Sequence, residues 1–246
     1  MRSSRRIPGI IGGAGPAATA QLYLDIVSRC RQAGLARRPP ILIASLDIDL
    51  AVEARLLREG VGIEDYWDPL LAAARSLTAA GADFLAIPCN TLHVLLPELQ
   101  QAVATPVLSI VDAVAREVDR VGCETVGLLS TSTTAGAGLY ENGLQQRGIA
   151  VVGIPADLQA ALDQRIEAEL EQPNGGGTGG LDARIMDYFA SRGAGAVIAG
   201  CTELKAMMSG WEIRLPVIDS LDALGAAVAQ DMIAGGDQTA ARATRP

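Results

Sequence analysis

The sequence predicts an α/β protein built from two similar halves, each a parallel sheet covered by helices on both faces. Short apolar runs alternate with longer amphipathic stretches, and one strand-end motif occurs twice. Strands buried on both faces read as short apolar runs, and their alternation with helices is typical of parallel sheets. Aromatic residues make up only 3% of the 246 residues, so the predicted cores are aliphatic.

The elements follow one another along the whole chain. Apolar runs bounded by Gly or Pro predict strands at 7–12, 40–46, 83–88, 106–109, 125–130, 149–153, 195–199 and 216–218. Amphipathic stretches between them predict helices at 16–33, 50–59, 66–80, 91–103, 112–121, 136–147, 157–171, 181–192, 202–209 and 220–234. The composition of residues 173–180 predicts a glycine-rich surface loop.

An internal repeat divides this series. The segment from Gly81 to Thr91 matches the segment from Gly193 to Glu203, with Cys eight residues after the first Gly in each. A Pro-Val strand follows both copies, and the apolar glycine-rich run at 9–13 parallels 127–131. Two α/β units of small-domain size are therefore predicted.

The repeat places Cys89 and Cys201 just after a strand and just before a helix. In an open α/β sheet this is the edge where ligands bind, and the helix N-terminus is expected to make the thiol more acidic than a free cysteine. Facing each other across a cleft, the two thiols would reach opposite faces of one carbon. The alternative is that each is a small buried apolar residue, as we expect for Cys30 and Cys123.

Polar and glycine residues surround these strand ends. The turn of Gly13, Ala14 and Gly15 would expose N–H groups to an anion, but Ala18 breaks a dinucleotide fingerprint. Several hydroxyl and amide side chains would either cap helices or bind a ligand carboxylate. They are Asn90, Thr91, Ser130, Thr131 and Thr202.

Composition excludes several chemistries. Of 20 basic residues only Lys205 is a lysine, so only it could form a pyridoxal Schiff base, and the single His93 rules out paired-histidine metal motifs. A net charge of -8 argues against general binding to nucleic acid or anionic membranes. There is no apolar run of membrane-spanning length and no signal peptide, and we expect a cytoplasmic protein.

Three segments resemble the motifs of the aspartate/glutamate racemase family. They are Gly12-Gly13-Ala14-Gly15-Pro16-Ala17-Ala18-Thr19, Pro88-Cys89-Asn90-Thr91-Leu92-His93 and Gly200-Cys201-Thr202-Glu203. The resemblance covers nearly the whole chain. It implies cofactor-independent racemisation by two cysteines in a cleft between two pseudo-symmetric domains, residues 1–111 with 218–246 and residues 112–217. It also implies that the last strand and helix return to the first domain, and commonly a homodimer.

The resemblance also implies roles for individual residues. Cys89 and Cys201 would be the two acid/base groups, and Asn90, Thr91 and Thr131 would hold the α-carboxylate. Aspartate-specific members carry a basic residue where this chain has Ala160, so an acidic side chain lacks its expected partner. The arginines that might replace it are otherwise solvated helix charges. They are Arg55, Arg58 and Arg165.

Three further residues have supporting roles with open alternatives. Asp47 would tune a thiol, orient the substrate ammonium or cap a loop. His93 would support the thiolate or be a buried structural histidine. Glu203 would be a helix-start carboxylate or a proton-relay partner of Cys201.

The sequence therefore predicts an amino-acid racemase that acts on a small amino acid or carboxylate without a cofactor or metal. Alternatives are a hydantoin racemase or another cysteine-dependent isomerase or decarboxylase, and a non-catalytic carboxylate-binding module. A zinc site of Cys89, His93, Cys201 and Glu203 is a further alternative, although its spacing is unusual.

Overall fold

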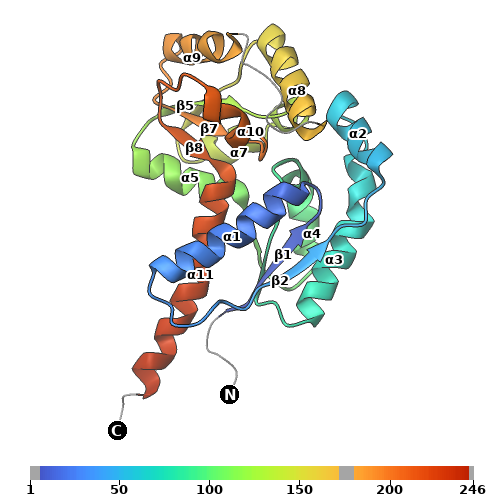
Figure 1. The fold of residues 1–246 in the computed structure, drawn as a ribbon, viewed down its shortest axis with the longest axis vertical. Coiled ribbons are helices and arrows are strands. Elements are labelled where there is room, and N and C mark those ends of the chain that lie inside the picture. The colour runs from blue at the N-terminus through green and yellow to red at the C-terminus, as the bar shows by residue number, and fades with distance from the viewer. Residues whose placement is uncertain (1–5, 172–179, 244–246) are drawn as a thin grey trace.

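The computed structural model describes residues 6–171 and 180–243, and it contains two four-stranded sheets (Figure 1). All strand pairs in both sheets are parallel. The predicted α/β class with two parallel sheets is confirmed. The predicted loop at 173–180 lies outside the described residues, except for Gly180.

The first sheet has the strand order β2-β1-β3-β4. Its strands are β1 (Pro8–Gly12), β2 (Leu42–Ser45), β3 (Phe84–Ala86) and β4 (Val107–Leu108). The helices between them are α1 (Pro16–Gln32), α2 (Leu50–Glu59), the 3-10 turn η1 (Ile63–Tyr66), α3 (Trp67–Ala79), the 3-10 turn η2 (Thr91–Leu95) and α4 (Leu96–Ala102).

The second sheet repeats this pattern with the order β6-β5-β7-β8. Its strands are β5 (Thr125–Leu129), β6 (Ala150–Val152), β7 (Ala196–Ala199) and β8 (Val217–Asp219). The helices are α5 (Ile110–Val121), α6 (Ser132–Gly136), α7 (Leu139–Gln145), α8 (Ala156–Glu171), α9 (Leu181–Ser191), α10 (Leu204–Met207), the 3-10 turn η3 (Met208–Gly210) and α11 (Ser220–Ala243).

The two sheets are structural repeats of one another. In each, the first strand of the unit lies at the centre, between the second and the third, and the fourth pairs with the third. Strands β3 and β7 occupy equivalent places, and each carries a cysteine just beyond its carboxyl end. The repeat seen in the sequence therefore corresponds to a repeat of the fold.

Helix α11 joins the halves. It packs along α1 of the first half and α5 of the second, as the long red helix in Figure 1 shows. One buried cluster contains Ile10 and Leu22 from the first half, Val126 and Ile198 from the second, and Leu224 of α11. Two further clusters cover the outer faces of the sheets, one in each half.

The last strand corrects one expectation. Strand β8 pairs with β7, so residues 217–219 belong to the second sheet and do not return to the first domain. The parallel backbone pairing of Val197 with Val217 and of Ile198 with Ile218 places β8 in the second sheet. Helix α11, by contrast, packs along α1 of the first half.

Several helix limits also differ from the predictions. The helix predicted at 136–147 is α7, and the short helix α6 precedes it without having been predicted; Gly138 separates the two with a left-handed backbone and a φ of 62°. The stretch predicted at 202–209 contains only the short α10 and a 3-10 turn. The helix predicted at 91–103 begins as the 3-10 turn η2.

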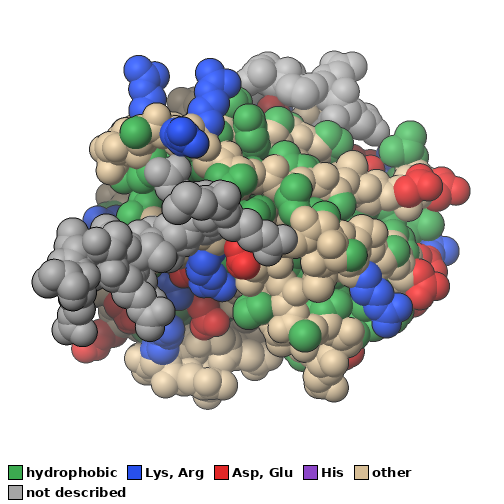
Figure 2. All heavy atoms as spheres, turned by 90° about the horizontal axis from the view of Figure 1, so that it is seen from below, with side chains coloured by type: hydrophobic (Ala, Val, Ile, Leu, Met, Phe, Trp, Pro, Cys, Tyr) green, Lys and Arg blue, Asp and Glu red, His purple; other side chains and the backbone are tan. Residues whose placement is uncertain are grey.

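The outer surface is mixed in character. On the face shown in Figure 2, Lys and Arg side chains are interspersed with Asp and Glu and with apolar side chains. Among the described residues, no helix has both the length and the apolar composition required to span a membrane.

Candidate active site

Cys89 and Cys201 come from equivalent strand ends of opposite halves. Cys201 is buried, and Cys89 is only partly exposed. The two thiols lie within electrostatic reach, since the charge on Cys89 contributes to the raised pKa of Cys201. The structure therefore brings the two predicted acid/base groups into one site between the halves.

The Cys89 thiol is held in its neutral form. Burial raises its pKa to about 11, and the negative charges of Glu203 and Glu53 act in the same direction. The backbone N–H groups of Leu92 and Thr91, at the start of η2, lower it but do not compensate. The expectation that a helix start would make this thiol more acidic than a free cysteine is wrong, because desolvation outweighs the local dipole.

The Cys201 thiol has a carboxylate partner. Its Sγ donates to Oε2 of Glu203 at 3.0 Å, and Oγ1 of Thr202 donates to the same oxygen at 2.8 Å. Burial and the charge of Glu203 raise the Cys201 pKa well above its usual value. Of the two roles predicted for Glu203, the contact matches a proton-relay partner, because a carboxylate accepting an S–H bond is placed to receive that proton.

The turn between β1 and α1 of the first half lies close to Glu203 and Thr202. A Cβ placed on Gly15 would lie 3.9 Å from both Oε1 of Glu203 and Oγ1 of Thr202. Gly15 has φ of 126°, a backbone that other residues rarely adopt. The N–H of Gly13 is not free for an anion, because it donates to Oγ1 of Thr19 at 3.2 Å.

His93 has a structural role. Its Nε2 accepts from the backbone N–H of Ile110 at 3.0 Å, so its Nδ1 carries the proton and donates to the Cys89 carbonyl at 2.8 Å. Burial lowers the His93 pKa to about 4, so the ring is neutral. Both ring nitrogens are occupied, so His93 positions the backbone of Cys89 and does not contact its thiol. The zinc alternative loses its imidazole ligand.

Asn90 lies in a buried network between the halves. Its Nδ2 donates to Oγ of Ser220 at 3.0 Å, and its Oδ1 accepts from the hydroxyl of Tyr140 at 2.6 Å. These partners belong to α11 and to α7 of the second half. In this arrangement the Asn90 amide joins the halves behind Cys89.

The threonines form a second bridge across the halves. Oγ1 of Thr91 lies 3.0 Å from Oγ1 of Thr134, which accepts from Oγ1 of Thr131 at 3.1 Å. Thr131 also caps α6 by accepting from the N–H of Thr134. The neighbouring Ser130 is buried and donates to the Thr131 carbonyl. These hydroxyls meet at the cleft, where a ligand carboxylate would compete for them.

Asp47 is exposed on the loop after β2. The cap of α2 is Asp49, whose Oδ1 accepts from the N–H of Ala51 at 2.8 Å.

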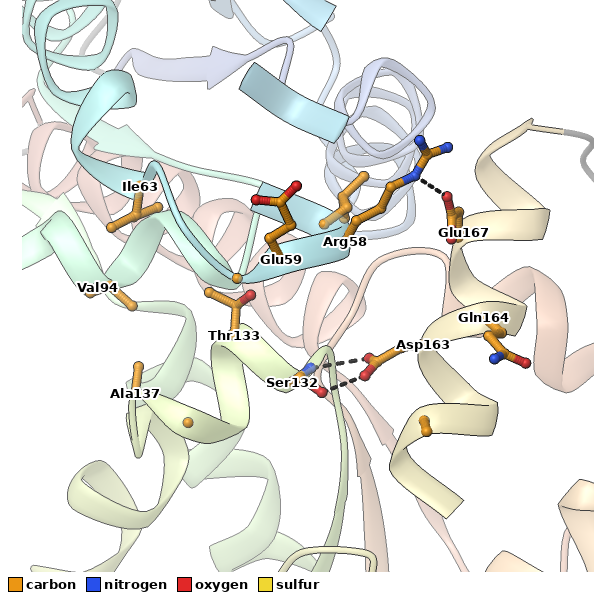
Figure 3. Close-up of a pocket in the computed structure, with 14 residues that line it drawn as sticks. Arg58, Glu59, Ile63, Val94, Ser132, Thr133, Ala137, Asp163, Gln164 and Glu167 are labelled. Atoms are coloured by element: carbon orange, nitrogen blue, oxygen red, sulfur yellow. Dashed lines mark hydrogen bonds and ion pairs between the residues drawn. The ribbon is translucent and has the colours of Figure 1, made fainter. Parts of the chain in front are cut away.

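A cavity of about 690 Å³ opens beside the threonine bridge (Figure 3). It lies between α2 of the first half and α6 and α8 of the second, and an ion pair of Arg58 with Glu167 crosses its mouth. Ala160 lines it, and so does Asp163, which accepts from the N–H and hydroxyl of Ser132. The charged side chains of its lining are the guanidinium of Arg58 and the carboxylates of Glu59, Asp163 and Glu167.

Two of the arginines that could replace the missing basic residue at position 160 form ion pairs with carboxylates. Arg55 pairs with Asp65 in η1, and Arg58 pairs with Glu167. Both guanidinium groups therefore already have a carboxylate partner.

Sequence reasoning missed two groups at the site, Glu53 and Tyr66. The charge of Glu53 acts on Cys89 and on the buried Tyr66, whose pKa is raised above its usual value mainly by burial. A signal existed for Glu53. Glu53 precedes the buried Leu56 by about one helical turn, so its carboxylate could be expected near the buried face of α2.

A search for metal-binding groups gives a negative result for the described part of the chain. Residues 6–171 and 180–243 contain no group of three or more His, Cys, Asp or Glu side chains arranged to hold a metal ion.

Comparison with known proteins identifies relatives along most of the chain. A family model described as Asp/Glu/Hydantoin racemase matches residues 11–228. The broad specificity amino-acid racemase RacX of Bacillus subtilis is 28% identical over 217 residues, which are 86% of this chain and 92% of RacX.

Solved structures agree with this match. A candidate Asp/Glu racemase from Yersinia pestis has a TM-score of 0.81 and 27% identity, covering 93% of this chain and 99% of that one. An aspartate racemase homologue from Pyrococcus horikoshii has a TM-score of 0.76 and 30% identity, covering 92% of this chain and 98% of that one. The fold is therefore shared over more than nine-tenths of each chain.

Proposed function

The chain belongs to the Asp/Glu/Hydantoin racemase family, and from this membership we propose that it inverts the α-carbon of an amino acid by two-base proton transfer between Cys89 and Cys201. One observation carries the proposal. Two cysteines from equivalent strand ends of opposite halves meet in one site. One thiol on each side of a carbon is what inversion of that carbon requires.

The first step is the formation of a thiolate. Both thiols are neutral in this structure, because burial raises their pKa values. Glu203 accepts the proton of Cys201 across the 3.0 Å contact between Sγ and Oε2. The ammonium group of the bound substrate adds a positive charge beside both thiols, which favours this transfer.

The second step is the inversion itself. The Cys201 thiolate removes the α-proton from one face, and the electron pair stays on the α-carbon as a carbanion. Cys89 then gives its thiol proton to the opposite face and becomes the thiolate. The reverse reaction begins from that state, with Cys89 as the base. No pyridoxal or metal cofactor is needed for these steps.

The carbanion requires stabilisation of the adjacent carboxylate. The hydroxyls of Thr91 and Thr131 and the amide of Asn90 lie at the cleft on either side of the half-to-half boundary. We assign them to the α-carboxylate, which would replace part of their mutual hydrogen bonding. Thr202 and the β1–α1 turn of Gly13, Ala14 and Gly15 would line the opposite side of the substrate, next to Glu203.

The test is racemisation measured by chiral chromatography on a panel of L-amino acids. We expect inversion of at least one amino acid by the native chain, without added cofactor, and its loss in Cys89→Ser and Cys201→Ser. Cys123→Ser is the matched control and should retain full activity, since Cys123 precedes the amino end of β5, whereas Cys89 and Cys201 follow the carboxyl ends of their strands. Full activity of either active-site variant would overturn the proposal.

The family resemblance also suggests a homodimer, and we propose this assembly for the chain in solution. Light scattering at defined protein concentration measures it, and a mass near 51 kDa, about twice the 25.5 kDa of one chain, is expected. A mass of one chain would contradict it.

A further inference from the structure

The segment of Ser130, Thr131 and Ser132 joins β5 to α6 and carries Thr131, one of the residues assigned above to the α-carboxylate. Ser130 is buried, whereas Ser132 is exposed. Ser132 and the following Thr133 line the cavity of about 690 Å³, and Figure 3 shows both at its edge. Close packing cannot fix a segment on the side where a cavity begins, so hydrogen bonds have to hold it there.

Two side chains of α8 supply these hydrogen bonds. Gln159 donates from Nε2 to the Ser130 carbonyl at 2.9 Å and to Oδ1 of Asp163 at 3.0 Å. Asp163 accepts from the N–H of Ser132 at 3.1 Å through Oδ1 and from the Ser132 hydroxyl through Oδ2 (Figure 3). The two residues are four positions apart and therefore lie on one face of α8. Together they hold the residue before Thr131 and the residue after it.

The Thr131 hydroxyl is linked by contacts to the surroundings of Cys89. Oγ1 of Thr131 donates to Oγ1 of Thr134 at 3.1 Å, and Oγ1 of Thr134 lies 3.0 Å from Oγ1 of Thr91. The backbone N–H of Thr91 in turn hydrogen-bonds the sulfur of Cys89. A displacement of the segment that carries Thr131 would therefore disturb the row of hydroxyls beside Cys89.

We propose that Gln159 and Asp163 are positioning residues that place the Thr131 hydroxyl for the α-carboxylate of the substrate. The inference rests on the proposed racemase function and adds to it two residues that act through Thr131 and not on the reacting carbon. A donor has to be held to within about 0.5 Å of its productive place, and only a supported side chain is held so closely. The pair on α8 therefore controls recognition of the carboxylate.

The test measures recognition of the carboxylate itself. The L-amino acid of the racemisation panel that binds most tightly is compared, by calorimetry, with its α-carboxamide, which keeps the amine and the side chain. The quantity is the ratio of the two Kd values, because a general loss of folded protein affects both ligands equally and leaves their ratio unchanged. We expect the native chain to bind the amino acid at least about tenfold more tightly than the amide, as for hydrogen bonds to a charged group.

The variants remove the contacts of α8 one at a time. In Asp163→Ala the ratio should fall about fivefold or more, the effect of losing about one hydrogen bond, because Ser132 loses its partner. Asp163→Asn should keep most of the ratio, since its carbonyl oxygen can accept from the Ser132 N–H while its amide donates to the Ser132 hydroxyl. Gln159→Glu keeps the shape of a half-buried side chain and should also lower the ratio, because a carboxylate cannot donate to the Ser130 carbonyl.

The matched control is Asp157→Ala, which removes a carboxylate of the same helix whose partner is Arg184 on α9. It should leave the ratio unchanged. A ratio near one in the native chain, or a native ratio kept in both Asp163→Ala and Gln159→Glu, would overturn the proposal. An equal fall in Asp157→Ala, or a fall in Asp163→Asn as large as in Asp163→Ala, would also contradict it.

Racemisation of the same amino acid, measured by chiral chromatography, separates this inference from the proposed function. If the native chain binds amino acids and inverts none, the racemase proposal fails, while a ratio that falls in Asp163→Ala and is kept in Asp163→Asn still supports the positioning of Thr131. If an amino acid is racemised and the ratio does not respond to either α8 residue, the racemase proposal stands and the positioning is wrong. A native chain that binds no amino acid of the panel overturns both.

Discussion

At the scale of single residues, the two thiols differ in what can accept their protons. Cys201 donates directly to Glu203, whereas the sulfur of Cys89 is hydrogen-bonded by the backbone N–H groups of Leu92 and Thr91. The equivalent position to Glu203 in the first half is Thr91, which bonds to Thr134 across the boundary. The pair is therefore symmetric in backbone placement and asymmetric in chemistry.

This asymmetry leads to a prediction for Glu203→Gln. The amide cannot accept the Cys201 proton, so kcat for racemisation should fall by about 10²-fold or more, as for loss of a general base. The hydrogen bond from Thr202 can persist, so the free energy of unfolding in urea should change little. Glu212→Gln, at an exposed position, is the control. A kcat close to that of the native chain would remove Glu203 from the mechanism.

His93 gives a prediction about stability and pH. Its folded pKa of about 4 is below the usual 6.5, so its contribution is fully present above about pH 6.5 and is lost as pH falls toward 4. That difference corresponds to about 3 kcal/mol. Urea unfolding at pH 7, 5.5 and 4 should show a steeper acid loss in the native chain than in His93→Gln. Parallel losses would contradict a buried neutral imidazole.

Single residues also show what sequence reasoning can reach. Cys89, Cys201 and Glu203 could be predicted to lie together because the repeat places them at equivalent strand ends. The raised pKa values of the two thiols could not be predicted from the sequence. They arise from burial and from the charges of carboxylates, and for Cys89 these carboxylates are distant in sequence. Glu53 was missed for the same reason, because its distance from Cys89 in the sequence hides their proximity.

At the scale of elements, the close packing of strands and helices depends on glycines at a few points. In β5, a Cβ on Gly127 would lie 2.6 Å from Cγ of Phe189 in α9. Phe189 is fully buried and belongs to the cluster on the outer face of the second sheet. The helix can approach the strand only because Gly127 has no side chain.

Gly127→Ala should therefore reduce the free energy of unfolding by about 1–3 kcal/mol, the usual range for overpacking. In a Phe189→Leu background the same substitution should cost less, because the ring that clashes is gone. Urea denaturation of the four proteins measures both effects. Gly153→Ala is the control, since its Cβ would meet nothing within 4 Å. An equal cost in both backgrounds would contradict the contact.

Strands and helices can be predicted from the sequence where neighbouring residues determine them. All eight strands were expected from apolar runs bounded by Gly or Pro, and all eight are present among the described residues. The division between α6 and α7 was not expected, because it depends on the left-handed backbone of Gly138 inside an otherwise helical pattern. The pairing of β8 with β7 is a long-range choice that no local signal encodes.

At the scale of the whole molecule, the halves are joined on two sides. On one side α11 packs between α1 and α5 in a continuous apolar core. Near the cavity, the contacts are polar, with the Arg58–Glu167 ion pair and the hydroxyl of Thr133 donating to the Leu56 carbonyl at 3.3 Å. The apolar side is held by buried side chains, and the polar side by exposed or partly exposed groups.

The ion pair should contribute little to overall stability. Its side chains are 58% and 37% exposed, and exposed pairs contribute about 1 kcal/mol or less. A double-mutant cycle of Arg58→Ala and Glu167→Ala, measured by urea unfolding, should give a coupling energy below about 1 kcal/mol that shrinks with added salt. A large coupling that does not respond to salt would show a buried clamp.

The central claim is that two cysteines act on opposite faces of one carbon, and isotope exchange tests it most directly. Each single-cysteine variant is incubated in D₂O with the L- and D-enantiomers of a substrate, and α-deuterium is measured by mass spectrometry. We predict that Cys89→Ser exchanges the α-proton of one enantiomer only, that Cys201→Ser exchanges that of the other only, and that neither inverts it. Exchange of both enantiomers by one variant, or inversion by either, would contradict the two-base account.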